Sequence, residues 1–187
     1  MNRLNTYKSS ATAGRETENN FKNLMISRGN IVRKANKEQD CVNKVDFIIK
    51  TKENNILKFQ VKNRNTPGRN QGKDDNFITL EFKNTRGDDG WMYGDSNYLA
   101  KEVDGGFNIY HMTTLKEFAE ARTQKNVTTT RLVDSYVKGM PYKIYKRKGS
   151  YGHKNYDELI YANVHEIKEF FLEKSKSVYF LPSKRED

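Results

Sequence analysis

A chain of 187 residues fits one domain with its own core. Hydrophobic residues make up 35% of the chain, and 10 Phe, 11 Tyr and one Trp supply enough large apolar side chains to exclude wholesale disorder. The 34 Lys and Arg residues outnumber the 24 Asp and Glu residues, and the resulting net charge of +10 favours an acidic partner such as nucleic acid.

Several other classes of protein are excluded by what the sequence lacks. No apolar run approaches the roughly 20 residues that cross a bilayer, and the N-terminus carries no secretory signal. The single cysteine, Cys41, cannot form an internal disulfide, so we expect a reducing cytoplasm. There is no phosphate-binding glycine loop, so no nucleotide cofactor is expected, and His111, His153 and His165 lack the spacing of zinc ligands.

The N-terminal part of the chain is expected to contain one helix. Residues 1–11 are polar and show no periodicity, which predicts a flexible basic arm. Phe21, Leu24 and Met25 lie at helical spacing and predict a helix over 12–28, which a Gly-Asn pair then ends.

Strands dominate the middle of the chain. Two segments rich in alternating apolar residues, 45–50 and 56–63, flank an Asn-containing turn and predict a β-hairpin. The other expected elements are a short strand over 30–34, loops over 35–43 and 63–76, a strand over 77–82, a hairpin of strands 98–102 and 107–112, a helix over 115–122 begun by a capping box of Thr114 and Glu117, and a helix over 164–174 capped by Asn163. This order predicts an α/β (α+β) domain with a mixed β-sheet flanked by helices.

The first hairpin places polar side chains together on one of its faces. Because side chains alternate along a strand, Gln60 and Lys62 share one face, opposite the apolar face that carries Phe59 and Val61. Asp46 lies on the polar face of the preceding strand, so it is expected to approach Gln60 and Lys62 across the hairpin.

These residue types suit the hydrolysis of a phosphodiester. The carboxylate of Asp46, the amide oxygen of Gln60 and the carbonyl of Val61 are hard oxygen ligands of the kind that Mg²⁺ binds. Lys62 would orient or activate the attacking water and offset the charge that develops on phosphate. Glu18 lies on the same helix face as Phe21 and would complete the site.

These motifs resemble those of the PD-(D/E)XK nuclease superfamily, and in particular its variants with Q-x-K in place of D/E-x-K. The resemblance covers roughly residues 13–64. It rests on three segments, in chain order: Gly14-Arg15-Glu16-Thr17-Glu18 opening a helix, Val45-Asp46-Phe47, and Phe59-Gln60-Val61-Lys62.

The resemblance implies a restriction-endonuclease-like core and a metal-dependent deoxyribonuclease. The motif series is most similar to that of small homing endonucleases and also resembles that of Mrr-type restriction nucleases, while Holliday junction resolvases share the layout of a helix followed by a hairpin. The implied catalytic set is Glu18, Asp46, Gln60 and Lys62, with Mg²⁺, or Mn²⁺ in its place, held by Asp46, Gln60, Val61 and Glu18. The implied partner is DNA, cut by a homodimer.

Two other carboxylates compete with these choices. Glu16 lies about 200° around the helix from Glu18, so only one of the two can face the site, and Glu18 is favoured because it shares the apolar face. Asp40 is an alternative to Asp46, but it lies in a polar segment that is expected to be a loop.

Basic residues outside the catalytic set are expected to contact the DNA backbone. They are Arg64, Arg69 and Lys73 in the loop after Lys62, and Lys143, Lys146, Arg147 and Lys148 in a segment where tyrosines and basic residues alternate without acids. We therefore expect one domain over 1–187, with a catalytic core over about 12–122 and a basic, Tyr-rich extension over about 123–187 that contacts DNA or forms a dimer.

The predicted function is that of a Mg²⁺-dependent DNA endonuclease of the homing or restriction type. Two alternatives remain at this stage: a structure-specific junction resolvase, and a catalytically inactive DNA-binding module that keeps a nuclease-like core.

Overall fold

The computed structural model describes residues 3–64, 74–148 and 156–183. In this part of the chain it contains two mixed β-sheets and four α-helices, which confirms the predicted α+β class with a mixed sheet flanked by helices. Sequence analysis treats the chain as one domain, whereas the structure divides it into two compact units. The first consists of Met1–Arg64, Asp95–Tyr110 and Tyr179–Asp187, and the second of Asn65–Gly94 and His111–Val178.

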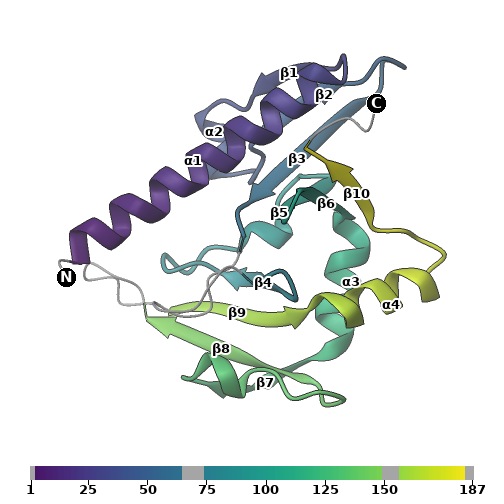
Figure 1. Cartoon of the computed structure of the whole chain (residues 1–187). Helices are drawn as coiled ribbons and strands as arrows, with labels where there is room; N and C mark the ends of the chain where they lie inside the picture. The colour runs from purple at the N-terminus through teal and green to yellow at the C-terminus, as the bar shows by residue number, and fades with distance from the viewer. Residues whose placement is uncertain (1–2, 65–73, 149–155, 184–187) are drawn as a thin grey trace. The chain divides into compact units, whose positions relative to one another are not determined.

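The first unit is built on a six-stranded sheet with the order β1-β2-β3-β5-β6-β10 (Figure 1). The strands are β1 (Ile31–Lys34), β2 (Phe47–Lys50), β3 (Ile56–Lys62), β5 (Tyr98–Val103), β6 (Gly106–His111) and β10 (Tyr179–Pro182). The predicted hairpins of 45–50 with 56–63 and of 98–102 with 107–112 correspond to β2–β3 and β5–β6. In the first hairpin Asn54 adopts a φ of 66°, the conformation for which asparagine suits a turn.

Strand β3 pairs with one antiparallel strand and one parallel strand. Strand β2 runs antiparallel to it, with Phe47 opposite Phe59, and β5 runs parallel to it, with Lys62 beside Lys101. The register confirms the predicted alternation, because Phe59 and Val61 enter the apolar core while Gln60 and Lys62 lie on the other face.

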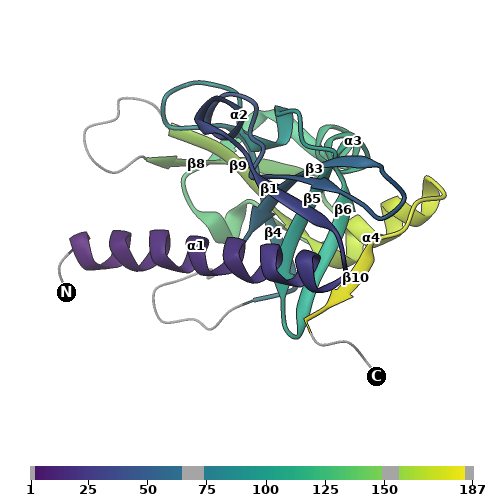
Figure 2. The ribbon, with the colours of Figure 1, turned by 90° about the horizontal axis from the view of Figure 1, so that it is seen from above.

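Helix α1 (Arg3–Ser27) covers the apolar face of this sheet. Its side chain Phe21 is fully buried, with its ring centroid 5.2 Å from those of Phe59 and Phe107. The prediction of a flexible arm over 1–11 is wrong for residues 3–11, because the helix already begins at Arg3 and its first turns extend beyond the edge of the sheet of this unit (Figure 2). Residues 3–11 lack the apolar stripe by which a helix is recognised in a sequence.

The second unit is built on a four-stranded sheet with the order β4-β9-β8-β7. The strands are β4 (Phe77–Lys83), β7 (Thr123–Thr129), β8 (Tyr142–Lys148) and β9 (Tyr156–Asn163), and two 3₁₀ turns, η1 (Trp91–Tyr93) and η2 (Leu132–Asp134), belong to the same unit. Strands β7, β8 and β9 were not expected from the sequence. Strand β9 pairs antiparallel with both β4 and β8 and so forms the centre of this sheet.

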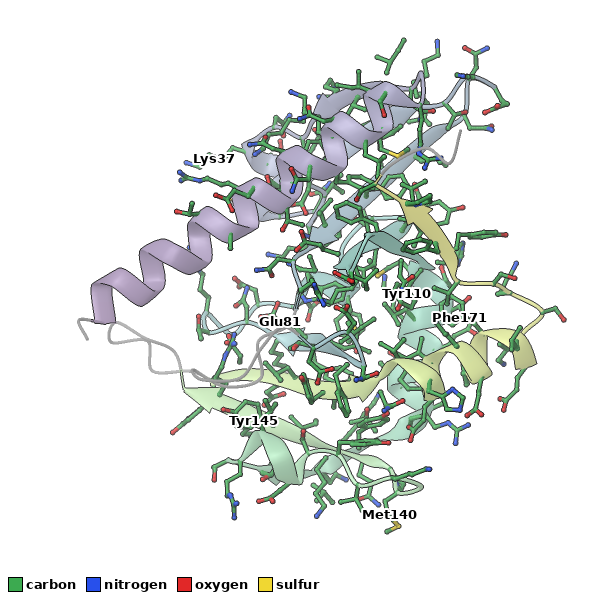
Figure 3. The ribbon with its side chains drawn as sticks, in the orientation of Figure 1. Lys37, Glu81, Tyr110, Met140, Tyr145 and Phe171 are labelled. Atoms are coloured by element: carbon green, nitrogen blue, oxygen red, sulfur yellow. The ribbon has the colours of Figure 1, made fainter. Side chains whose placement is uncertain are left out.

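Helices α3 (Met112–Arg122) and α4 (Val164–Glu173) pack in the second unit around Phe118, whose ring contacts both Tyr142 and Phe170. The prediction that Asn163 caps α4 is confirmed, since its side chain accepts hydrogen bonds from two backbone N–H groups of the first turn. The predicted Thr114 capping box is wrong, because α3 begins at Met112, three residues before the predicted start, and Thr114 lies buried inside it. Side chains fill the interior of each unit, as Tyr110 does in the first and Phe171 in the second (Figure 3).

Two smaller features complete the description. The segment 35–43, expected to be a loop, contains the short helix α2 (Lys37–Cys41), which is closed at its start by a capping box of Asn36 and Gln39. Within the described residues, no helix combines the length and apolar character that crossing a membrane requires.

Candidate active site

The centre of the candidate site is the carboxylate of Asp46, one residue before β2 in the first unit. Its Oδ2 atom accepts two hydrogen bonds of 2.6 Å, one from the side-chain amide of Gln60 and one from the backbone N–H of Val61. The Asp46 backbone N–H donates in turn to the carbonyl of Phe59, which fixes the residue against β3. The predicted approach of Asp46 and Gln60 across the hairpin is therefore confirmed.

The two hydrogen bonds to one carboxylate oxygen leave the other available. Among the described residues, Oδ1 of Asp46 and Oε1 of Gln60 accept no hydrogen bond, although Asp46 is only 7% exposed. Carboxylate and amide oxygens of this kind suit Mg²⁺, as does the adjacent carbonyl of Val61, so the residues present fit the metal that the family resemblance implies. No group of three or more His, Cys, Asp or Glu side chains in the described ranges could hold a metal, so water and phosphate oxygens would complete its coordination.

Burial raises the pKa of the Asp46 carboxyl to about 6 from its ordinary value of 3.8. The positive charge of Lys62 and the hydrogen bond from the Val61 N–H lower the pKa, whereas the charges of Glu18 and Asp40 raise it. The Lys62 ammonium therefore acts electrostatically on Asp46, as the sequence predicts for a catalytic pair. A carboxylate that is kept partly desolvated among these groups is typical of a functional site.

This raised pKa has a consequence for stability. Between about pH 4 and pH 6 the folded protein keeps the Asp46 proton that the unfolded chain releases, so a rise in pH through this window lowers the free energy of unfolding. Above about pH 6 the folded protein carries the full free-energy cost of the ionised, buried Asp46 carboxylate. The Asp46→Asn variant cannot ionise, and its single amide oxygen can accept both hydrogen bonds that Oδ2 accepts now.

We therefore expect Asp46→Asn to be more stable than the natural protein by about 1–3 kcal/mol near pH 7.5 without divalent metal, with little difference near pH 4. Urea denaturation at both pH values measures this. Asp40→Asn makes the same chemical change at an exposed position and removes only one of the smaller charges that raise the pKa of Asp46, so its pH-dependent gain should be much smaller. A variant of Asp46 that is equally stable or less stable near pH 7.5 would contradict the account.

The Glu18 carboxylate lies at the same end of the first unit but has its own partner. Its Oε2 atom accepts a hydrogen bond of 2.9 Å from the ammonium of Lys34, the last residue of β1. The Glu18 charge also contributes to the pKa of Asp46, while Glu16 is exposed. This arrangement agrees with the preference for Glu18 over Glu16.

Two lysines of the first unit, Lys34 and Lys101, were not predicted from the sequence to have a role near the site. Lys34 could have been found from the alternation in β1, because Val32 packs against the core and Lys34 follows it on the same face. Lys101 is only 1% exposed, and its ammonium donates to the carbonyl of Asn63, directly after Lys62. No local pattern indicates this role, since it depends on the parallel pairing of β3 with β5.

The chain segment that leaves β3 is held by the acidic residues of β5 and the turn after it. The Arg64 backbone N–H and the Thr17 hydroxyl both donate to Oε2 of Glu102, at 3.2 and 3.0 Å. The Arg64 guanidinium pairs with Asp104 at 3.2 Å. Arg64, predicted to contact DNA, thus already has an acidic partner, and the predicted contacts Arg69 and Lys73 lie outside the described residues.

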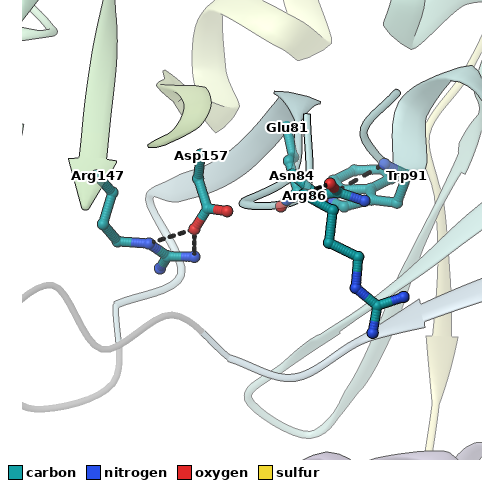
Figure 4. A network of polar contacts seen from close by, with 6 residues as sticks. All are labelled: Glu81, Asn84, Arg86, Trp91, Arg147 and Asp157. Atoms are coloured by element: carbon teal, nitrogen blue, oxygen red, sulfur yellow. Dashed lines mark hydrogen bonds and ion pairs between the residues drawn. The ribbon is translucent and has the colours of Figure 1, made fainter. Parts of the chain in front are cut away.

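The predicted DNA contacts of the second unit lie on β8. Arg147 donates to Oδ2 of the buried Asp157 through Nε and Nη2, at 2.8 and 2.5 Å (Figure 4), and Lys146 pairs with Glu158 at 3.4 Å. Lys143 is half-buried, and of Lys148 only the backbone is described. The segment 136–156 contains no acidic residue before β9. The acidic residues that pair with its basic side chains lie on the neighbouring strand β9.

Two tyrosines of this region, Tyr136 and Tyr142, pack against each other in the second unit. Tyr136 and Tyr142 stack with ring centroids 5.5 Å apart, and both hydroxyls donate to the carboxylate of Glu166. Both tyrosines therefore have a structural role, and the Tyr142 ring is too deeply buried to stack on bases.

The chain matches no protein-family model, no curated protein and no solved structure with significance.

Proposed function

We propose that the protein is a Mg²⁺-dependent DNA endonuclease of the PD-(D/E)XK type, in its Q-x-K variant, which hydrolyses phosphodiester bonds. One observation carries the proposal. Asp46, Gln60 and Lys62 meet on one face of the β2–β3 hairpin, with one oxygen of Asp46 and one of Gln60 unbonded within the described residues.

The topology around the site is compatible with this proposal. A helix carrying Glu18 precedes an antiparallel hairpin carrying Asp46 and the Gln60–Lys62 pair, and a parallel strand, β5, follows on the other side of β3. The helix and the hairpin follow the order of the motifs on which the sequence resemblance rests.

Each side chain has a distinct role in the proposed reaction. A bound Mg²⁺ would activate water for attack and offset the negative charge of the phosphate. Gln60 and the Val61 N–H hold the Asp46 carboxylate so that Oδ1 faces away from them, and the Lys62 ammonium would donate to the phosphate oxygen on which charge develops. Gln60 is neutral where a carboxylate is more usual, so the phosphate itself is expected to contribute to metal affinity.

The proposed partner is DNA, because the net charge of +10 provides sequence-independent attraction to phosphates. Cutting both strands takes two sites, and a homodimer is the simplest way to supply them. The cytoplasm is the proposed location, in agreement with the single, exposed Cys41.

The experiment that tests this function is cleavage of supercoiled, linear and branched DNA in Mg²⁺ and in EDTA. The natural protein is compared with Asp46→Asn and with the matched variant Asp40→Asn, all purified in parallel so that a contaminating nuclease would be seen in each. We expect metal-dependent cleavage by the natural protein and by Asp40→Asn, and at least about a hundredfold loss in Asp46→Asn.

The outcomes separate the candidate functions. Preference for linear or supercoiled DNA with a defined cut site would support the homing or restriction type, and preference for branched DNA would support a junction resolvase. DNA binding without cleavage on any substrate would instead identify an inactive binding module.

A further inference from the structure

Lys34 occupies a particular place beside the proposed metal site. It is the last residue of β1, its Cα lies opposite that of Phe47, and the next backbone N–H, of Ala35, donates to the carbonyl of Asp46 at 2.9 Å. The strand pairing thus ties the backbone of Lys34 to that of the central carboxylate. Its side chain reaches Glu18 on α1, at 2.9 Å.

The Lys34 ammonium is surrounded by negative charge. The hydrogen bond to Glu18 raises the pKa of Lys34, partial burial lowers it, and the charges of Glu18, Asp40 and Asp46 raise it further. The ammonium therefore acts on the same carboxylates that would attract a divalent cation. The side chain is nevertheless 61% exposed, so it can leave this position without losing a packed environment.

We propose that Lys34 is the resident counter-cation of this site, and that its ion pair with Glu18 competes with the binding of a divalent metal at the Glu18 carboxylate. This inference rests on the proposed function and adds a regulatory element to it. In the absence of metal the ammonium neutralises Glu18, and when metal binds, the ammonium is released toward solvent.

The physical reason is competition for one carboxylate. A metal ion bound to Oε2 of Glu18 would replace the 2.9 Å hydrogen bond from the ammonium, and a metal ion bound to Oε1 would lie close to a group of like charge. Removing the ammonium removes both this competition and the repulsion between two cations at close range. For an exposed ion pair we expect the affinity for metal to rise by about three- to tenfold.

The test is Mn²⁺ binding in the absence of DNA, followed by electron paramagnetic resonance of the free ion, for the natural protein and Lys34→Met. Arg33→Met is the matched control, because it removes one positive charge at the neighbouring, exposed position of the same strand. We expect tighter binding by about three- to tenfold for Lys34→Met and a change of less than about twofold for Arg33→Met.

A second comparison identifies Glu18 as the shared partner. In a Glu18→Gln background the ion pair is absent and only the screened repulsion between the two cations remains, so adding Lys34→Met should raise the affinity for Mn²⁺ by less than about twofold. An undiminished gain in that background would overturn the inference. So would unchanged or weaker binding in Lys34→Met, or an equal gain in Arg33→Met.

Failure of this inference can be told apart from failure of the proposed function. If Mn²⁺ binding is lost in Asp46→Asn but is unchanged in Lys34→Met, the metal site is supported and the proposed role of Lys34 is wrong. If the natural protein shows neither Asp46-dependent Mn²⁺ binding nor DNA cleavage, both fall together.

Discussion

Replacing Lys62 with methionine is expected to slow single-turnover cleavage of supercoiled DNA by about 10²- to 10³-fold, with little change in DNA affinity. Methionine keeps much of the length and apolar volume of the side chain but removes the positive charge beside Asp46. The loss has two sources. The charge that develops on the phosphate is no longer offset, and the pKa of Asp46, which Lys62 lowers, should rise, so more of the carboxyl is protonated near neutral pH.

The control for this prediction lies on the same strand. Lys58 shares its face of β3 with Gln60 and Lys62 but is four residues from Lys62, so Lys58→Met removes the same charge away from Asp46. It should keep a rate within about threefold of that of the natural protein. DNA binding is measured in Ca²⁺ for all three proteins. A Lys62→Met rate as high as that of Lys58→Met would contradict the assigned role.

The largest expected effect on stability is at Phe21. This side chain is fully buried in the first unit, and its ring lies 5.2 Å from Phe59 and Phe107 and 6.2 Å from Phe47. Phe21→Ala removes a large part of the apolar contact between α1 and the sheet, to which Leu24 and Met25 also contribute. We expect the free energy of unfolding to fall by about 3–5 kcal/mol, measured by urea denaturation followed by circular dichroism.

The matched substitution is Phe180→Ala on β10 of the same unit. Phe180 is 54% exposed, so its truncation should cost less than about 1 kcal/mol. If the two variants lost equal stability, or if Phe21→Ala lost less than about 1 kcal/mol, the packing of α1 on the sheet would have been assigned incorrectly.

Sequence reasoning succeeded where the relevant pattern is local. The alternation of apolar and polar residues in two adjacent strands was sufficient to bring Asp46 to Gln60, because a short turn fixes the pairing of a hairpin. In the same way, the Asn163 cap and the periodicity of the last helix located α4. These features depend on neighbours within about 15 residues along the chain.

The features that were missed depend on pairing between distant segments. Asp157 and Glu158, which partner Arg147 and Lys146, lie on β9, a strand that was not anticipated. Burial of Lys101 similarly requires β5 to lie parallel to β3, which is separated from it by 35 residues of chain between Lys62 and Tyr98. The basic segment of β8 contains no acidic residue, but acidic side chains from another strand lie beside it in the fold. The composition of the segment alone therefore did not predict the charge around it.

The central claim is that Asp46 and Gln60 form a metal site, and the most direct measurement is anomalous scattering from crystals of the protein soaked in Mn²⁺. The account predicts one anomalous peak at coordination distance, about 2.0–2.3 Å, from Oδ1 of Asp46, with the Gln60 amide oxygen or the Val61 carbonyl as a second ligand. Asp46→Asn crystals treated in the same way should lack it. Mn²⁺ bound elsewhere in the natural protein, with Asp46 still free, would contradict the claim.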